Sequence, residues 1–352
     1  MNRIELIIDR KKVRGNDGQT ILEIALENGI HIPHLCYHPK LTKTGACRLC
    51  IVRINGKALK ASCVETATDG MKVVTEDEEI IKARKWLLEL LLMEGDHNCL
   101  YCDANGDCDL QKYVQYYGVE EPSGESLREE RVVDYESSNA LKRNENRCIL
   151  CGRCVRACRE IQVSNVWGFA ERGSRTHLIA DDDKRIGESS CVKCGLCVQL
   201  CPTGALTFQT VLGRGPVWEQ TKGSSICIYC GVGCRIDFYK NKEGLLIRTL
   251  GDDDGPNRGH LCIKGRFGFD FVQSKKRVVS PLIKKNGEFK KASWDEALSF
   301  VASKFTEIKN VYGPDSIAAL SSAKCTNEEN YLMQKLMRSV IRTNNVDHCA
   351  RL

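Results

Sequence analysis

The residues with the clearest capacity for chemistry in this sequence are its cysteines, of which there are 21 among 352 residues. Nineteen fall into four segments with different spacings, and only Cys325 and Cys349 stand apart. Closely spaced thiolates bind soft metal centres, whereas disulfide frameworks of this density are typical of short secreted domains. The first residues lack the basic and apolar regions of a signal peptide. We therefore expect a reducing, cytoplasmic setting in which the thiols bind metal.

The third segment carries the strongest signal, because the run C-x2-C-x2-C-x3-C occurs in it twice. In this bacterial ferredoxin run, the fourth cysteine of each copy ligates the cluster of the other copy. The sequence thus predicts two [4Fe–4S] clusters within residues 138–212, one held by Cys148, Cys151, Cys154 and Cys201 and the other by Cys191, Cys194, Cys197 and Cys158. Gly152 and Gly195 relieve crowding where backbone amides point at the sulfurs. Arg159 replaces the proline expected after the first run, and zinc is the alternative occupant.

The first segment, within residues 1–78, places four cysteines after a strand, a turn and a helix. Residues 4–8 alternate like a strand, and Thr20 can cap a helix through Asn28, with Gly29 as its stop. This order predicts a β-grasp ferredoxin, although the ten-residue first gap departs from plant-type spacing. The candidate ligands are Cys36, Cys47, Cys50 and Cys63, with zinc as the alternative occupant.

The residues around these cysteines carry a family resemblance. The run Cys36-Tyr37-His38-Pro39, followed by Gly45-Ala46-Cys47-Arg48-Leu49-Cys50, resembles the N-terminal [2Fe–2S] domain of respiratory complex I and iron-only hydrogenases. The same relatives carry, after a helix such as Lys82–Met93, a [4Fe–4S] cluster with one histidine and three cysteines. For residues 79–119 this resemblance implies the ligands His97, Cys99, Cys102 and Cys108. Three cysteines alone cannot fill four thiolate positions.

The position of the histidine leaves alternatives open. In many of these relatives it stands four residues before the first cysteine, where this sequence has Gly95. Asp96 is therefore an alternative fourth ligand. His97 could also be a surface residue that caps the loop and binds no metal.

The fourth segment, residues 220–277, combines Cys227-x2-Cys230-x3-Cys234 with a distant Cys262 after a turn-rich stretch. It resembles the N-terminal [4Fe–4S] domain of molybdopterin oxidoreductases, which implies the ligands Cys227, Cys230, Cys234 and Cys262. In that family a lysine just after the fourth cysteine lies between cluster and pterin. The resemblance therefore implies Lys264 as an electron relay, and an ordinary exposed lysine is the alternative.

Two acidic stretches are interpreted as solvated chain rather than as active sites. Residues 120–137 hold seven acidic side chains around a Pro-Ser-Gly sequence, which is typical of a connector. Asp181, Asp182 and Asp183 are adjacent, whereas calcium ligands are spaced around a loop, so we expect a turn. The sequence has no strand-linked G-x-G-x-x-G and no P-loop, so it shows no nicotinamide or ATP site of its own.

Residues 278–352 have the alternation that opens an α/β domain. Ser293 is placed to cap an amphipathic helix through about Asn310. A short strand is expected at Ser316–Leu320, followed by a second helix at Asn327–Arg342.

The end of the chain resembles formate dehydrogenases, through Cys325–Tyr331, Gln334-Lys335 and Thr343–Leu352. In that family the next residue is the selenocysteine or cysteine that ligates molybdenum or tungsten, so this ligand is expected just after Leu352 and is absent. UGA encodes both selenocysteine and termination, and we hypothesise that an in-frame UGA was translated as a stop. Cys349 precedes the ligand position by four residues and is interpreted as a packing cysteine.

Together these resemblances imply an α+β multidomain chain, the N-terminal part of the catalytic subunit of a formate dehydrogenase that oxidises formate to carbon dioxide or runs the reverse reaction. The implied cofactors are one [2Fe–2S] cluster, four [4Fe–4S] clusters and a molybdenum or tungsten bis-pterin guanine dinucleotide. Electrons would pass along the clusters to a partner, which could be a diaphorase-type NAD(P)/flavin subunit, a ferredoxin or a hydrogenase subunit. The alternatives are a non-catalytic electron-transfer subunit and the large iron–sulfur subunit of complex I.

Charge and hydropathy exclude other classes of function. The net charge of +6 is small for 352 residues, so we expect no nucleic-acid partner. The longest apolar run, Trp86–Met93, is interrupted by Glu89 and is too short to span a bilayer, so we expect no membrane span.

Overall fold

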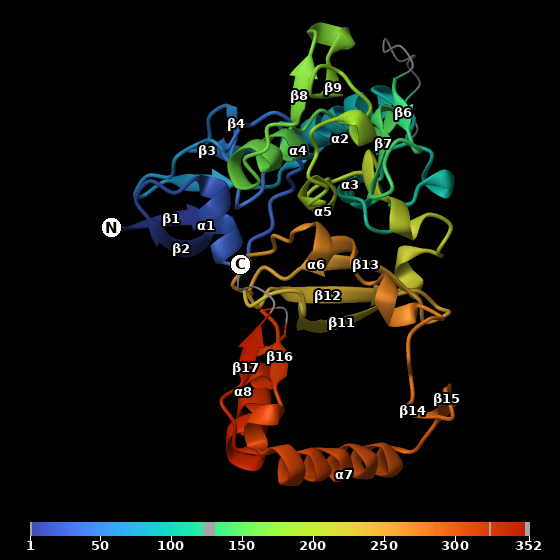
Figure 1. Ribbon diagram of the computed structural model, residues 1–352. Coiled ribbons are helices and arrows are strands. Elements are labelled where there is room, and N and C mark those ends of the chain that lie inside the picture. The colour runs from blue at the N-terminus through green and yellow to red at the C-terminus, as the bar shows by residue number, and fades with distance from the viewer. Residues whose placement is uncertain (1, 121, 123–130, 324, 349–352) are drawn as a thin grey trace. The chain divides into compact units, whose positions relative to one another are not determined.

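Residues 2–120, 122, 131–323 and 325–348 are described by the structure, a computed structural model (Figure 1). The chain divides into two units, and each has sheets and buried clusters of its own. The first unit comprises residues 1–221 with 241–243, and the second comprises residues 222–240 and 244–352.

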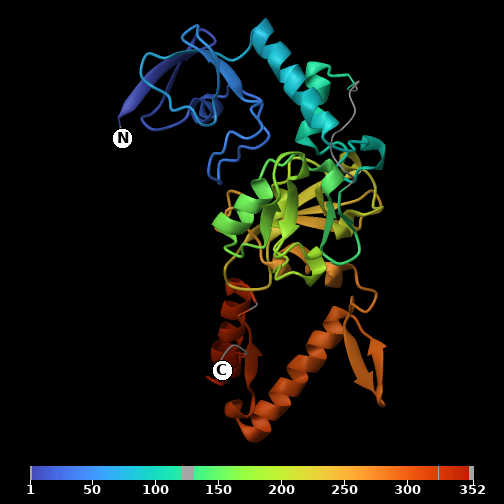
Figure 2. The same ribbon diagram turned by 90° about the horizontal axis from the view of Figure 1, so that it is seen from above.

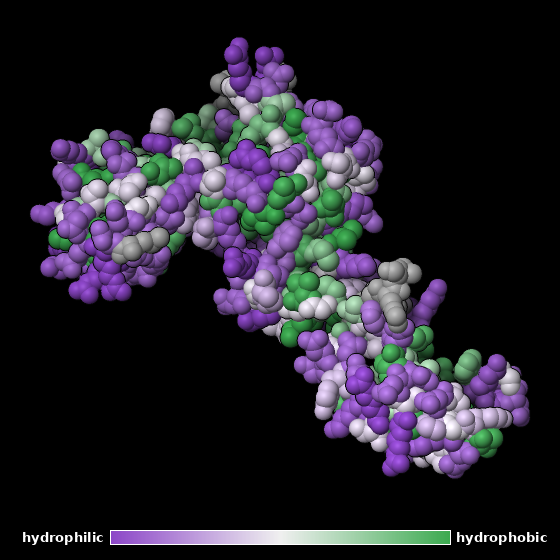
Figure 3. Space-filling view, turned by 60° about the vertical axis from the view of Figure 1, so that its left-hand side comes forward, coloured by the Kyte–Doolittle hydropathy of each residue, from purple (hydrophilic) through white to green (hydrophobic). Residues whose placement is uncertain are grey.

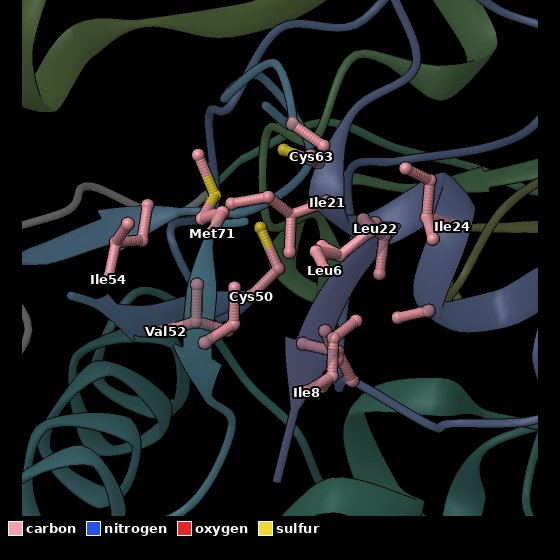
Figure 4. Close-up of a cluster of buried hydrophobic side chains, with 14 of the residues drawn as sticks. Leu6, Ile8, Ile21, Leu22, Ile24, Cys50, Val52, Ile54, Cys63 and Met71 are labelled. Atoms are coloured by element: carbon pink, nitrogen blue, oxygen red, sulfur yellow. The ribbon is translucent and has the colours of Figure 1, made fainter. Parts of the chain in front are cut away.

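The first unit begins with a five-stranded sheet of order β2-β1-β5-β3-β4. Strands β1 and β5 are parallel, whereas the other neighbours are antiparallel. The elements are β1 Arg3–Ile8, β2 Lys11–Asn16, α1 Ile21–Glu27, β3 Ile51–Ile54, β4 Leu59–Ala61 and β5 Lys72–Val74. Every second residue of β1 is buried, as expected for a strand with one face on a core. Figure 4 shows Leu6 and Ile8 of β1 in the same core as Ile21, Leu22 and Ile24 of α1. The predicted β-grasp arrangement is confirmed.

Helix α1 begins with a capping box. The Glu23 N–H donates to Thr20 Oγ1 at 3.4 Å, and the Thr20 N–H donates to Glu23 Oε2 at 2.8 Å. The helix ends at Glu27 with Asn28 as its C-cap, and Gly29 adopts a left-handed φ of +71°. Both ends of the helix therefore lie where the sequence predicted them.

Loss of this cap should weaken α1 locally. Thr20→Ala is expected to lower the opening free energy of the α1 amides by about 1 kcal/mol, because the Glu23 N–H loses its acceptor. Thr20→Ser loses the methyl group but keeps the hydroxyl, and it should retain most of this free energy. Amide hydrogen exchange measures both variants. Equal losses in the two would contradict the capping role.

Two helices follow the sheet, α2 Glu78–Met93 and α3 Asp109–Tyr117. Helix α2 ends at Met93 as predicted but starts earlier than Lys82, because Asp77 Oδ1 accepts from the Ile80 N–H at 2.8 Å and caps it. These helices share a buried cluster with the loops that precede and follow them: Leu35, Leu49, Leu88, Leu110, Tyr117 and Ile149. This cluster packs beside half-buried Cys47, Cys108 and Cys151, so it supports three of the cysteine segments.

The ferredoxin-like part of the first unit has one small sheet and one hairpin. Its strands are β6 Val133–Asp134, β7 Leu141–Asn144, β8 Trp167–Ala170, β9 His177–Ala180 and β10 Leu206–Phe208. Strand β7 pairs with β10 and with β6, whereas β8 and β9 pair only with each other among the described strands. This hairpin was not expected from the sequence.

The two cysteine runs repeat the same local structure. Helices α4 Arg153–Arg156 and α5 Leu196–Gln199 each follow a glycine, Gly152 or Gly195, with φ 69° and ψ 8°. This left-handed conformation favours glycine at both positions. Helix α4 continues into a π-helical turn at Ala157–Ile161, which contains Arg159. A proline there would interrupt the helix, so its absence from the first run agrees with the structure.

One of the two acidic stretches differs in part from what was predicted. In the expected connector, residues 121 and 123–130 lie outside the described residues, and Asp134 belongs to β6. Asp134 is buried and accepts from the Ser137 hydroxyl and the Ile186 N–H, so the prediction of solvated chain is wrong at this residue. The turn at residues 181–183 is confirmed. There Asp181 Oδ2 accepts from the Ser190 N–H at 2.7 Å.

The second unit contains a three-stranded sheet and the start of an α/β domain. The elements are β11 Thr221–Ile226, β12 Arg235–Lys240, β13 Leu246–Gly251, α6 Ile263–Phe267, β14 Leu282–Lys285, β15 Glu288–Lys291, α7 Trp294–Tyr312, β16 Ala319–Ser321, α8 Asn327–Lys335 and β17 Val346–His348. Strands β16 and β17 are parallel, and α8 lies alongside them in both Figure 1 and Figure 2. Parallel strands joined through a helix confirm the predicted α/β pattern.

Details of this α/β segment differ from the prediction. Ser293 and Glu296 form a capping box that starts α7, as expected. The predicted strand at Ser316–Leu320 begins later, because residues 314–316 form a short 3-10 turn. The second helix changes from α to π geometry at Leu336 before it ends at Arg342.

Hydrophilic side chains cover most of the face shown in Figure 3, and hydrophobic side chains form separate patches on it. Within the part of the chain that the structure describes, no helix is both long and apolar enough to cross a membrane.

Candidate metal centres

The cysteines of the first segment meet beside the β-grasp core. Cys36, Cys50 and Cys63 are each 1% exposed, and Cys47 is half-buried. Side-chain hydrogen bonds join Cys47 to Cys36, Cys36 to Cys63, and Cys63 to Cys50. The Cys36 N–H also donates to Cys47 Sγ at 3.4 Å. The structure therefore brings all four predicted ligands of this segment into one connected group.

These contacts divide the thiols into two kinds. The hydrogen bond from Cys47 holds the pKa of Cys36 far below its ordinary value, and the bond from Cys63 lowers the pKa of Cys50 to about 7. The same bonds raise the pKa of Cys47 and of Cys63. Thiolates are the metal-binding form of cysteine, so binding of a metal centre displaces the protons that the second pair retains.

The second segment surrounds a cavity of about 280 Å³. His97, Cys99, Cys102 and Cys108 all line it. The ring of His97 is oriented by the Leu91 carbonyl, which accepts from Nε2 at 3.1 Å, so a metal bond from this ring would use Nδ1. Metal-binding histidines commonly donate their other ring N–H to such a carbonyl. Asp96 instead accepts from the Asn98 N–H at 3.0 Å and is not among the lining residues, so the geometry favours His97.

A glycine that sequence reasoning missed forms part of the same wall. A Cβ placed on Gly204 would lie 2.4 Å from Cys102 Sγ and 3.5 Å from Arg147 Cδ. Only a hydrogen atom fits at such a close approach. Gly204 follows the Cys201-Pro202 pair of the second ferredoxin run, and Cys108 Sγ donates to the Pro202 carbonyl at 3.6 Å. The ferredoxin segment thus shapes the cavity of the preceding segment.

In the structure, cysteines of the two ferredoxin runs lie close to one another. Burial, followed by the charges of Cys201 and Cys148, raises the pKa of Cys151 to about 12. Cys158, Cys191, Cys194 and Cys197 line one small cavity of about 20 Å³. Burial and then the charges of the neighbouring thiolates, including Cys158, raise the pKa of Cys197. Each group of three therefore lies near the last cysteine of the opposite run, which is the arrangement that the sequence predicts.

Backbone amides do point at sulfur in both runs. The Leu150 N–H donates to Cys148 Sγ, and the Lys193 N–H donates to Cys191 Sγ, each at 3.4 Å. Both residues have a positive φ, of 50° and 54°, which turns these amides back toward the first cysteine. Hydrogen bonds to ligand sulfurs are one determinant of iron–sulfur reduction potentials.

The crossed arrangement predicts which cluster each serine substitution perturbs. Cys201→Ser should alter the cluster held by Cys148, Cys151 and Cys154, although residue 201 belongs to the second run. Cys158→Ser should alter the other cluster. Electron paramagnetic resonance of the reduced full chain distinguishes the two signals. If each variant instead altered the cluster held by the first three cysteines of its own run, the crossed assignment would be contradicted.

The cysteines of the fourth segment also form one group. Burial and then the charges of Cys227, Cys230 and Cys262 raise the pKa of Cys234. The Cys227 N–H donates to the Cys234 carbonyl at 2.8 Å, which closes the loop between them. Cys230 and Cys262 are exposed, whereas Cys227 is buried.

Lys264 lies beside this group in the second unit. It is exposed on α6, two residues after Cys262, and it lines a cavity of about 270 Å³ together with Cys227 and Tyr229. The structure therefore places Lys264 next to the cysteines, as the resemblance implies. Its role in electron relay stays a prediction.

The donor sets suit polynuclear clusters. Among the described residues, no three or more His, Cys, Asp or Glu side chains are arranged to hold a single metal ion. An iron–sulfur cluster spreads its cysteines over several irons, so its ligands need not converge on one point. Thiolate-rich donors select zinc or iron–sulfur centres, and the 280 Å³ cavity with its glycine wall offers more room than a single ion needs. Cys325 is half-buried outside these groups, and Cys349 lies outside the described residues.

Five family models match successive parts of the chain. They are the 2Fe-2S iron-sulfur cluster binding domain at residues 1–78, the NADH-ubiquinone oxidoreductase-G iron-sulfur binding region at 84–123, the NADH-quinone oxidoreductase subunit 3 ferredoxin-like domain at 138–207, the molybdopterin oxidoreductase Fe4S4 domain at 221–274 and molybdopterin oxidoreductase at 277–352. The last two models are both of molybdopterin oxidoreductase and match residues 221–274 and 277–352. Models of the complex I and hydrogenase kind match the residues before them, which confirms the predicted resemblance and the predicted fold class.

Curated relatives align with nearly all of this chain. The NADPH-Fe(3+) oxidoreductase subunit alpha of Geobacter sulfurreducens is 37% identical over 99% of the chain and 40% of its own length. "Probable oxidoreductase YjgC" of Bacillus subtilis is 36% identical over 98% of the chain and 39% of its own length. "Putative formate dehydrogenase YrhE" of the same organism is 35% identical over 99% and 40%. The chain thus spans about two-fifths of the length of the curated relatives it matches.

A solved structure resembles part of the chain. It is the crystal structure of an NAD+-reducing [NiFe]-hydrogenase in the H2-reduced state. The match has a TM-score of 0.57 and 35% sequence identity, and it covers 61% of this chain and 91% of the hydrogenase chain. Iron–sulfur domains of this kind therefore occur in other redox assemblies.

Proposed function

We propose that this chain is the N-terminal part of the catalytic subunit of a formate dehydrogenase, which oxidises formate to carbon dioxide or catalyses the reverse reaction. The observation that carries the proposal is the presence, on one chain, of four cysteine segments whose predicted ligands lie close together and of a match to molybdopterin oxidoreductase after them. The choice of formate is supported by the resemblance of Cys325–Tyr331 and Thr343–Leu352 to formate dehydrogenases, and by the name of the relative YrhE.

The four cysteine segments supply the ligands of five proposed clusters, because the third segment supplies two sets. One [2Fe–2S] cluster would be held by Cys36, Cys47, Cys50 and Cys63. Four [4Fe–4S] clusters would be held by His97 with Cys99, Cys102 and Cys108; by Cys148, Cys151, Cys154 and Cys201; by Cys191, Cys194, Cys197 and Cys158; and by Cys227, Cys230, Cys234 and Cys262. When bound, these clusters supply one-electron transfer between a molybdenum or tungsten pterin centre and a partner subunit.

The chain's own side chains bind, orient and shield these groups. The buried thiols of the first segment exclude water from their group, and the Leu91 carbonyl fixes the ring of His97. Lys264 would provide a cationic contact between the fourth cysteine group and a pterin. A diaphorase-type NAD(P)/flavin subunit, a ferredoxin or a hydrogenase subunit would be the redox partner, in a cytoplasmic complex.

A second candidate is a non-catalytic electron-transfer subunit, either free-standing or of the complex I type. The observation that favours it is the likeness to a chain of the NAD+-reducing hydrogenase, of which this chain covers 91%. In that case the residues after 277 would serve only for docking to another protein.

Metal analysis and a reductant assay test the proposal on anaerobically purified protein with its co-purifying subunits. Five clusters of the proposed types require about 18 irons per chain and equivalent acid-labile sulfide. Formate should reduce the clusters when the complete catalytic subunit is present. Zinc in place of iron would overturn the cluster assignments. Reduction by hydrogen or NADH but not by formate would instead establish the electron-transfer candidate.

A further inference from the structure

The side chain of Arg156 occupies an unusual place between two of the cysteine groups. It lies on α4, two residues after Cys154, and is 3% exposed. Its guanidinium donates to four backbone carbonyls within the first unit. Burial of a cation costs free energy unless hydrogen bonds and nearby negative charge compensate it. The acceptors and charges around Arg156 therefore decide how this burial is stabilised.

The four acceptors come from two separate cysteine loops. Arg156 Nη2 donates to the Cys36 carbonyl at 2.7 Å and to the Cys151 carbonyl at 3.1 Å. Nη1 donates to the Thr42 carbonyl, and Nε donates to the Gly152 carbonyl at 3.2 Å. One guanidinium thus links the first and third cysteine segments through the backbone of a proposed ligand in each. The planar fork of arginine suits several acceptors at once, which a lysine ammonium cannot match.

Apolar and polar contacts dock the same loop on the same helical segment. Leu41, from the loop between Cys36 and Cys47, is buried with Ala157, Leu196 and Leu200. Thr42 donates from its N–H to Glu160 Oε2 at 2.9 Å and from its hydroxyl to Glu160 Oε1 at 2.5 Å. The Leu41 and Thr42 contacts therefore help to fix the geometry of the Arg156 hydrogen bonds.

The hydrogen-bond acceptors of Arg156 carry no net negative charge to balance its guanidinium. Its four acceptors are all neutral carbonyls, and Glu160, an acidic group that interacts with it electrostatically, accepts hydrogen bonds from Thr42. Thiolate-ligated clusters on the two cysteine groups would place negative charge on both sides of the guanidinium. A fixed positive charge beside a cluster stabilises the reduced, more negative state and raises its reduction potential.

We propose that Arg156, by bridging the Cys36 and Cys151 carbonyls, positions the two ligand loops against each other and raises the reduction potentials of both clusters. Arg156 is a positioning residue, since it acts through the backbone of the ligands and through its charge. The inference rests on the iron–sulfur part of the proposed function and is independent of formate as the substrate.

Redox titration of the reconstituted full chain, followed by electron paramagnetic resonance, tests this inference. Arg156→Met should lower the midpoint potentials of the Cys36 and Cys151 clusters, each by at least a tenfold change in the reduction equilibrium, which is 59 mV for a one-electron couple. The cluster of Cys227 should not shift. Arg156→Lys keeps the charge with fewer donors, and it should restore most of the potential.

Further variants separate charge from folding. Arg159→Met removes a positive charge three residues further along the chain, where the side chain is 60% exposed. Because water screens exposed charge, this substitution should change the reduction equilibrium of neither cluster by more than about twofold. Glu160→Gln removes the nearby negative charge without opening a cavity, and it should raise both potentials. If Arg156→Met does not retain its clusters, Arg156→Gln decides the question, because it removes the charge but keeps amide N–H donors, and it should lower both potentials.

Iron content and resonance signals measure the clusters directly. Failure of the proposed function would therefore be recognised separately, by missing iron in the unaltered chain. With full iron, unchanged potentials in Arg156→Met, or in Arg156→Gln where the Met variant loses its clusters, would overturn the role of Arg156.

Discussion

Replacement of Gly204 by alanine is expected to remove the cluster of the second segment, about four of some 18 irons per chain. The added Cβ would lie 2.4 Å from Cys102 Sγ, which is far inside any tolerated contact, so either the sulfur or the backbone must move. The backbone has little freedom, because the Thr203 hydroxyl donates to the Arg147 carbonyl at 2.9 Å and the Asn144 N–H donates to the Ala205 carbonyl at 2.8 Å. Displacement of the cysteine is therefore the expected outcome.

Iron analysis and electron paramagnetic resonance of the anaerobic full chain measure this effect. Gly223→Ala is the matched control, because a Cβ at Gly223 meets no heavy atom within 4 Å and its φ is not in the left-handed region. It should retain all clusters. Full iron content and an unchanged signal in Gly204→Ala would show that the second segment does not use Cys102 in this geometry.

The substitution His97→Ala is expected to have a similar effect on the same cluster. Loss of the fourth ligand should leave a cluster that loses iron, with up to four irons lost per chain. His97→Cys supplies a thiolate at the same place in the loop and should recover much of the iron. Both variants are measured by iron content and by the resonance signal of the reduced chain.

Asp96→Ala is the control that the structure offers for this site. Asp96 accepts from the Asn98 N–H and does not line the cavity, so its removal should leave the iron content unchanged. Loss of the cluster in Asp96→Ala with retention in His97→Ala would reverse the assignment and identify the aspartate as the fourth ligand.

Much of the fold was predictable because its signals are local. The capping boxes at Thr20 and Ser293 each span four residues, and they fix the starts of α1 and α7. The cysteine runs are also local, and the shared φ of +69° at Gly152 and Gly195 follows from the repeated sequence. The proximity of Cys201 to the first run and of Cys158 to the second is a long-range feature, and the crossed assignment of these cysteines stays a prediction from the characteristic run.

Features that depend on distant partners were not predictable. Asp134 has the composition of an acidic connector, yet it is buried because the Ile186 N–H, 52 residues later, donates to it. Gly204 looks like any glycine after a ferredoxin run, and its function depends on Cys102, from a different segment. The choice between His97 and Asp96 likewise required the orientation of two neighbouring side chains.

The contacts of Arg156 also have a consequence for the order of assembly during synthesis. The Cys36 carbonyl and its Arg156 donor are 120 residues apart in the chain. At translation rates of 5–20 residues per second, the first cysteine loop would wait roughly 6 to 24 s after leaving the ribosome before its docking partner emerges. During that interval the local β-grasp core can fold, while the loop that carries Cys36 and Cys47 lacks its anchor. Thiols are most open to oxidation at this stage, so cluster insertion in the first domain should be most sensitive to oxygen while the chain is nascent.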